Sequence, residues 1–248
     1  LAKLHLSLDA PYQFQAIVYI PKKPPFDFMM DNQKRRGMQL YVRRVFILDH
    51  AEELLPPYLR FVRGVVDSDD LPLNVSREIL QKNQVITAIQ KQLVKKTLEE
   101  LKRVKTDKPD EYRAFFDEFG VILKEGLFLD SGNRDRLADL LLYGSRKTPE
   151  DKVIGLADYV AAMPEAQKDI YYATGLSRAQ VEHSPHLEAL RARDLDVLFL
   201  TDAKGGVLIH PLSSVVLEAD PELVVPGEDS HRRRPYFASR RCRRLRRS

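Results

Sequence analysis

The sequence has little cysteine and no long apolar run. Cys242 is the single cysteine among 248 residues, so no disulfide can form within the chain, and a reducing, cytoplasmic location is expected. The longest apolar runs, such as residues 16–20, are far shorter than the roughly 18 residues that a membrane helix needs. No charged and apolar leader is present, so no signal peptide is expected. Leu1 already opens a strand pattern, which indicates a piece of a longer protein.

Phosphate-binding glycine loops and metal-ligand clusters are also missing. The 11 glycines form neither GxGxxG nor GxxxxGK[ST], so this chain alone has no usual means of gripping a nucleotide. His183 and His186 are three residues apart, but no cysteine or acid completes a metal-binding set with them. Cys242 lacks an orienting histidine and asparagine. We therefore expect no metal site and no thiol nucleophile.

The chain is basic only at its end. Nine arginines and no acid lie in residues 231–248, although the whole chain has a net charge of only +4. The other 31 basic residues face 36 acidic ones over residues 1–230, a net charge of −5. The basic balance therefore gives no reason to expect nucleic-acid binding by the folded part. Because like charges repel and little apolar surface is available there, residues beyond about 225 are predicted to be disordered.

Hydrophobic periodicity predicts a mixed α/β chain. Residues 13–20 alternate as a strand and stop at Pro21, and residues 79–101 carry the longest amphipathic helical pattern. Further strands are predicted within residues 3–48 and at 64–66, and further helices at 52–62, 109–120 and 134–142. After residue 148, helices are predicted at 156–163, 177–183 and 186–192, and strands at 169–174 and 196–201. Their order predicts parallel pairing in a small α/β lobe.

Two charged features allow more than one interpretation. Asp67, Asp69 and Asp70 form either a magnesium site or a solvated turn, and the turn is favoured because magnesium sites usually also use a phosphate ligand. Arg77 stands at the start of a helix, where the positive end of the dipole disfavours a cation. It is therefore either aimed at an anion or an ordinary surface arginine, and the residues alone favour the surface interpretation.

Two uninterrupted runs, residues 40–47 and 58–81, closely resemble the middle domain of the 90-kDa heat-shock chaperone family, of the bacterial high-temperature protein G type. Shorter matches lie at residues 124–126, 158–160, 167–175 and 197–202. The resemblance extends from residue 1 to about residue 202. It implies an α/β fold of two sandwich lobes joined by a helical stretch. The implied segments are a large lobe at 1–106, a helical connector at 107–143, a small lobe at 144–205, and an Arg-rich tail outside the family at 206–248.

The resemblance also implies the site residues. The family's catalytic loop corresponds to residues 74–81, in which Arg77 is implied to reach the γ-phosphate of ATP. Gln81 is implied to support that contact, and Asn74 to hold the loop. Phe46 matches an apolar position that packs beneath the loop. ATP and Mg²⁺ are implied to be held by an N-terminal ATPase domain, and a C-terminal dimerisation domain to make the full-length protein a homodimer.

The implied partners are non-native client proteins. Binding to a membrane or to a nucleic acid is not expected. Tyr112, Phe115, Phe116 and Phe119 share one helix face, which is either part of the core or a client-binding surface. The leading interpretation is thus the middle segment of an ATP-dependent chaperone that binds clients and completes ATP hydrolysis. A stand-alone protein-binding module without ATP coupling is one alternative.

The sequence departs from the family pattern after Asp202. The residues that follow Asp202 form an arginine-rich sequence of low complexity. Two interpretations are open: a change of reading frame, or a genuine basic arm, which would make the chain a nucleic-acid-binding α/β protein. Little aromatic interleaving supports base stacking in the arm, so the frame change is favoured.

Overall fold

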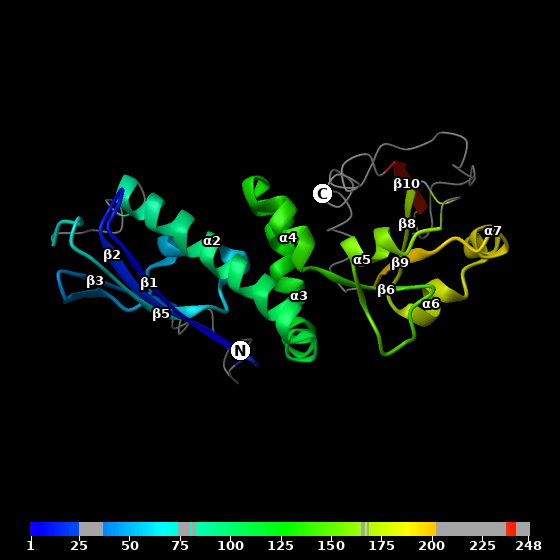
Figure 1. Ribbon diagram of the computed structural model, residues 1–248, viewed down its shortest axis with the longest axis horizontal. Helices are drawn as coiled ribbons and strands as arrows, with labels where there is room; N and C mark the ends of the chain where they lie inside the picture. Colours follow the sequence, from blue (N-terminus) through cyan, green and yellow to red (C-terminus); the bar gives the residue numbers. More distant parts are fainter. Residues whose placement is uncertain are drawn as a thin grey trace. The chain divides into compact units, whose positions relative to one another are not determined.

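The alternation near the N-terminus becomes the first of two five-stranded sheets (Figure 1). Its strand order is β1-β2-β5-β3-β4, and only the β3–β5 pair is parallel. The bounds are β1 Ala2–Leu8, β2 Phe14–Ile20, β3 Met38–Val42, β4 Val45–Leu48 and β5 Arg63–Ser68. This computed structural model describes residues 1–24, 37–73, 80, 83–164, 167, 169–201 and 237–241. By contacts it forms two units, Leu1–Leu129 and Asp130–Ser248, and the four-segment division stays a prediction.

The side chains of β2 confirm the predicted strand. Every second residue, from Phe14 to Ile20, is at most 3% exposed, and the residues between them face outward. This is the period of two that a strand imposes when one face of its sheet packs on a core. The helix α2, Gln84–Asp107, lies over the buried face (Figure 1) and contributes a stripe of buried aliphatic residues.

The helix predicted for residues 52–62 is wrong. Two 3₁₀ turns take its place, η1 Glu52–Leu54 and η2 Pro57–Leu59. Leu55 between them is extended, with φ −140° and ψ 140°. A proline disfavours the helical conformation of the residue before it, and Pro56 follows Leu55 directly. Pro56 therefore prevents one continuous helix, and Leu54 instead of Leu55 is the buried residue.

The helix predicted at residues 109–120 is longer than expected. It was expected to end near Gly120, but α3 extends from Pro109 to Leu129. A Cβ on Gly120 would lie 2.9 Å from the Phe116 ring, so the missing side chain makes room for a neighbour within the helix. Glycine here is a packing residue and not a helix stop.

The aromatic face of α3 is core, so the client-binding interpretation of that face is wrong. Phe115 and Phe119 are fully buried, and Phe116 is 8% exposed. Phe61, near η2, packs with ring centroids 5.4 Å from Phe115 and 4.9 Å from Phe119. Arg60 reinforces this contact through a two-point ion pair with Glu125 of α3.

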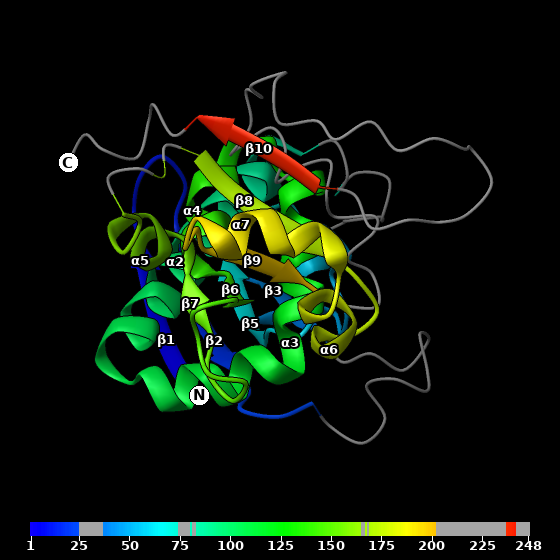
Figure 2. The same cartoon turned by 90° about the vertical axis from the view of Figure 1, so that its right-hand side faces the viewer.

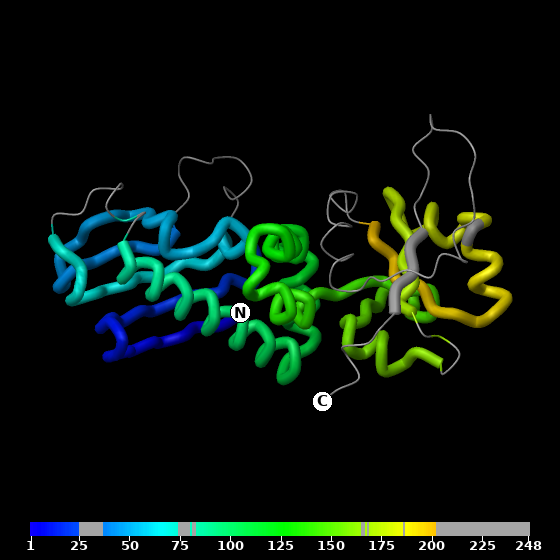
Figure 3. Tube along the Cα trace, turned by 90° about the horizontal axis from the view of Figure 1, so that it is seen from above, coloured from blue at the N-terminus to red at the C-terminus, as the bar shows by residue number. Residues whose placement is uncertain are grey.

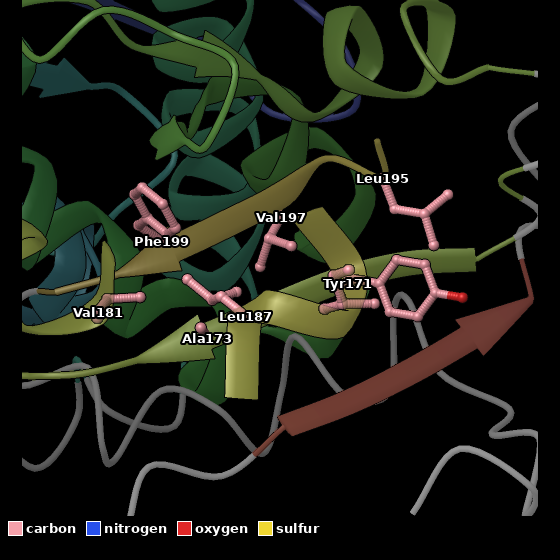
Figure 4. Packing of buried hydrophobic residues seen from close by; sticks show 8 residues of the cluster. Tyr171, Ala173, Val181, Leu187, Leu195, Val197 and Phe199 are labelled. Atoms are coloured by element: carbon pink, nitrogen blue, oxygen red, sulfur yellow. The ribbon is translucent and has the colours of Figure 1, made fainter. Parts of the chain in front are cut away.

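The second unit contains the other sheet, in the order β10-β8-β9-β6-β7. Its strands are β6 Leu142–Ser145, β7 Ile154–Gly155, β8 Asp169–Thr174, β9 Val197–Leu200 and β10 Phe237–Arg241. Its helical segments are η3 Ser131–Asn133, α4 Arg134–Leu140, α5 Leu156–Ala161, α6 Arg178–Glu182, η4 Pro185–Leu187 and α7 Glu188–Ala192. The predicted parallel pairing is confirmed between β8 and β9. Figure 4 shows the apolar cluster between these strands and the helical segments, including Val181, Leu187 and Val197. The α/β fold class is confirmed.

Disorder beyond about residue 225 stays a prediction; within this tail the structure describes residues 237–241. They form β10, which pairs with β8 in antiparallel register (Figure 2). Without β10, the outer edge of β8 would present unpaired amides and carbonyls, which favours the addition of a strand. Cys242 and the rest of the tail lie outside the described residues.

Neither of the long helices α2 and α3 has a stretch apolar enough to cross a membrane, and the same holds for every helix in the part of the chain that the structure describes.

Candidate functional site

The implied catalytic loop, residues 74–81, lies between β5 and α2 in the sequence. Asn74, Arg77 and Gln81 all lie outside the described residues, so their roles stay predictions. Leu71, before this segment, and Leu80, within it, are each only 1% exposed. Asn83 caps α2, because its side-chain oxygen accepts a hydrogen bond of 2.8 Å from the Val85 amide. The described residues that flank positions 74–79 and 81–82 are thus packed at Leu71 and Leu80 and capped at Asn83.

Phe46 lies in β4 and is 51% exposed. Its ring meets Tyr41 of β3 edge to face, with 5.5 Å between the centroids. An exposed phenylalanine on an outer strand is available for another segment of protein to cover. Its packing beneath the loop stays a prediction, since residues 74–79 are not described.

The carboxyl end of β5 is held on one side by the turn between β3 and β4. Arg43 and Arg44 form this turn with φ of 51° and 66°. A positive φ in a residue other than glycine costs on the order of 1 kcal/mol. Hydrogen bonds join the turn to β5: the Arg43 amide donates to the Ser68 carbonyl at 3.3 Å, and the Arg44 amide donates to Asp67 Oδ1 at 3.1 Å. Arg43 Nε also donates to the Asp69 carbonyl at 3.2 Å.

The turn between β1 and β2 holds the same end of β5 from the other side. The Gln13 amide donates to Asp70 Oδ2 at 2.6 Å, and Ser68 Oγ donates to the Gln13 carbonyl at 3.0 Å. Ser68 is only 1% exposed, so its hydroxyl is satisfied within the protein. In Figure 3 both turns and the start of α2 lie at one end of the first unit, where β5 leads toward the loop.

This geometry gives the acidic residues a role that neither interpretation contained. Two of the three carboxylates accept hydrogen bonds from main-chain amides of neighbouring turns, Asp67 from Arg44 and Asp70 from Gln13. No group of three or more potential metal ligands occurs among the described residues. The sequence did not reveal this arrangement, because Arg43-Arg44 lacks the Asn-Gly or Asp-Gly signal of a tight hairpin.

A buried polar cluster around Asp196 in the second unit has a structural role. The Asp196 carboxylate accepts hydrogen bonds from Ser145 Oγ at 3.1 Å and from the amides of Lys147 and Val197. Tyr159 donates to the Asp196 carbonyl at 2.7 Å, and burial raises the pKa of this phenol, which keeps it a donor. Both carboxylate oxygens are thus occupied in joining β6 to the start of β9.

Comparison with known proteins decides the family. The model of the family described as Hsp90 protein matches residues 1–214. The chain belongs to the Hsp90 family. The chain is 50% identical to the chaperone protein HtpG of Geobacter sulfurreducens over 222 residues, covering 90% of this chain and 33% of that protein. It is 52% identical to HtpG of Myxococcus xanthus over 202 residues, covering 82% and 30% of the two chains.

A solved structure gives the same result for the fold. The middle domain of a heat shock protein from Plasmodium falciparum superimposes with a TM-score of 0.76 at 33% identity, covering 86% of this chain and 82% of that one. The chain spans about a third of the length of its HtpG relatives. The Hsp90 match also continues past Asp202, where the resemblance was expected to end.

Proposed function

We propose that this chain is the middle segment of an ATP-dependent chaperone and that it completes ATP hydrolysis in a neighbouring N-terminal ATPase domain. The observation that carries this proposal is the similarity to HtpG chaperones and to a heat shock protein's middle domain. The buried side chains of Leu71, before the loop, and Leu80, within it, support the proposal, because a group delivered to another domain needs a rigid base.

Arg77 is the residue proposed to act on the nucleotide. ATP and Mg²⁺ are held by the N-terminal domain, and Arg77 neutralises charge that develops on the γ-phosphate during phosphoryl transfer. Gln81 supports the contact, Asn74 holds the loop, and Phe46 packs against it. An arginine supplied by a second domain couples hydrolysis to closure of the two domains.

Non-native client proteins are the proposed partners, with a homodimer formed through the C-terminal domain and a cytoplasmic location. Exposed apolar side chains are available for clients in both units. They include Ile17, Tyr19, Phe128, Leu129 and Leu176, from 36% to 86% exposed. Lys3 lies 5.8 Å from the ring of Tyr19, so a basic group accompanies this surface on the first unit.

We expect the 248-residue chain to bind an unfolded protein but not ATP. Reduced, carboxymethylated α-lactalbumin stays unfolded and exposes apolar segments, so it should bind saturably in a fluorescence anisotropy titration. Native α-lactalbumin is the matched control and should not bind. ATP at millimolar concentration should give no heat in calorimetry, because the chain lacks a phosphate-binding loop. Tight ATP binding, or equal binding of native and unfolded α-lactalbumin, would contradict the proposal.

Coupling to ATP is testable in a hybrid protein. We define the hybrid as HtpG of Geobacter sulfurreducens in which the region that matches residues 1–201 is replaced by those residues of this chain. The replaced region is about half identical, so the hybrid keeps the relative's own flanking segments around a new middle segment.

A further inference from the structure

We propose that the two turns beside β5 form a clamp that positions the catalytic loop for hydrolysis. The clamp consists of residues 67–70 at and just after the end of β5, Gln13 of one turn, and the turn at residues 43–44. Its catalytic consequence rests on the proposed function of Arg77. The hydrogen bonds among the clamp residues themselves do not depend on that role.

The hydrogen bonds of the clamp converge on the residues that lead into the loop. Two of them come from Gln13, as donor to Asp70 and as acceptor from Ser68. Others come from the opposite turn, to the Asp67 carboxylate and to the carbonyls of Ser68 and Asp69. The chain is therefore held from both sides just before it leaves the sheet.

The strained turn indicates that this arrangement is imposed by its surroundings. Two successive arginines with positive φ are unfavourable where glycine or asparagine would be relaxed. Such a conformation persists when neighbouring groups determine it. Here the Asp67 carboxylate accepts a hydrogen bond from the Arg44 amide, so the carboxylate and the turn fix each other's position.

The clamp is adjacent to the loop in the chain. Asp70 is followed by Leu71, whose side chain is fully packed, and the described backbone continues to Leu73. A rotation at residues 67–70 would therefore displace the origin of the loop. Because an error of about 1 Å in the position of a catalytic group can cost about a hundredfold in rate, a fixed origin is valuable.

The first test uses hydrogen exchange in the 248-residue chain. Asp67→Ala removes the acceptor of the Arg44 amide, and exchange of the backbone amides of residues 71–81 should become at least about tenfold faster. Asp67→Asn keeps an oxygen acceptor and should restore slow exchange. Asp69→Ala is the matched control, since it removes the same charge while the clamp uses the main-chain oxygen of Asp69. Urea unfolding should confirm that each variant is folded.

The second test measures ATP turnover in the hybrid. Asp67→Ala should lower kcat at least about fivefold with KM for ATP unchanged, and Asp67→Asn should recover most of it. If Asp67→Ala does not fold, Ser68→Ala serves in both tests, because it removes the bond to the Gln13 carbonyl with little change of volume.

Unchanged exchange in the folded alanine variant, or a loop that already exchanges at the intrinsic rate in the unaltered chain, would overturn the clamp. Faster exchange with unchanged turnover would overturn its catalytic role. Arg77→Ala in the same hybrid separates this result from failure of the proposed function: if Arg77→Ala slows hydrolysis while Asp67→Ala does not, only the clamp's role fails.

Discussion

Replacing Arg77 with alanine should slow ATP hydrolysis by the hybrid at least tenfold. A charge-assisted hydrogen bond to a phosphate oxygen contributes about 1.5–3 kcal/mol. If the contact forms mainly in the closed state, this free energy appears in kcat as a factor of about ten to a hundred. Nucleotide affinity should change little, because the N-terminal domain holds the nucleotide. Turnover and nucleotide affinity, measured separately, distinguish the two effects.

Two further variants define what the arginine contributes. Arg77→Lys should restore only part of the rate, because an ammonium group cannot make the two-point contact of a guanidinium. Arg113→Ala is a matched control: Arg113 pairs with Asp117 on the exposed side of α3, so its loss should leave turnover unaltered. If Arg77→Ala turns over ATP at the rate of Arg113→Ala, Arg77 is an ordinary surface arginine.

Replacing Phe115 with alanine should destabilise the first unit by about 3–5 kcal/mol. Its ring is fully buried, and its centroid lies 5.1 Å from that of the Phe119 ring and 5.4 Å from that of the Phe61 ring. Removal leaves a cavity between α3 and the segment after η2, which these rings join. Urea unfolding monitored by circular dichroism measures the change in the free energy of unfolding, with the two units treated as separate transitions.

Phe128→Ala on the same helix is the matched control. Phe128 is 45% exposed, so its loss should change the free energy of unfolding by less than about 1 kcal/mol. A folded Phe115→Ala variant of unaltered stability that binds unfolded α-lactalbumin more weakly would contradict the core assignment and restore the client-binding interpretation of this face.

Local pattern was sufficient where one rule acted alone. The alternation from Phe14 to Ile20 identified β2, and the apolar positions of α2 and α3 are buried as their spacing predicts. Prediction was wrong where neighbours decided the outcome. Gly120 does not end α3, because it packs against Phe116. The pairing of residues 237–241 with the edge of β8 was not predicted, because no pattern in the tail indicates it.

The site divides in the same way. Arg77, Gln81 and Asn74 are implied only by resemblance to a family, and their roles stay a proposal. Asp67 and Arg44 were not identified as partners, because 23 residues separate them and only the parallel pairing of β3 with β5 brings them together. Contacts of this kind depend on topology, which periodicity does not supply.

The ATP turnover of the hybrid protein tests the central claim most directly. If residues 1–201 complete the active site of a neighbouring ATPase domain, the hybrid should hydrolyse ATP within about tenfold of unaltered HtpG of Geobacter sulfurreducens, since a misplaced catalytic group alone can cost about a hundredfold. Its nucleotide affinity should be that of the parent protein. A folded hybrid that binds ATP with parental affinity but hydrolyses it at least a hundredfold more slowly than the parent would contradict the account.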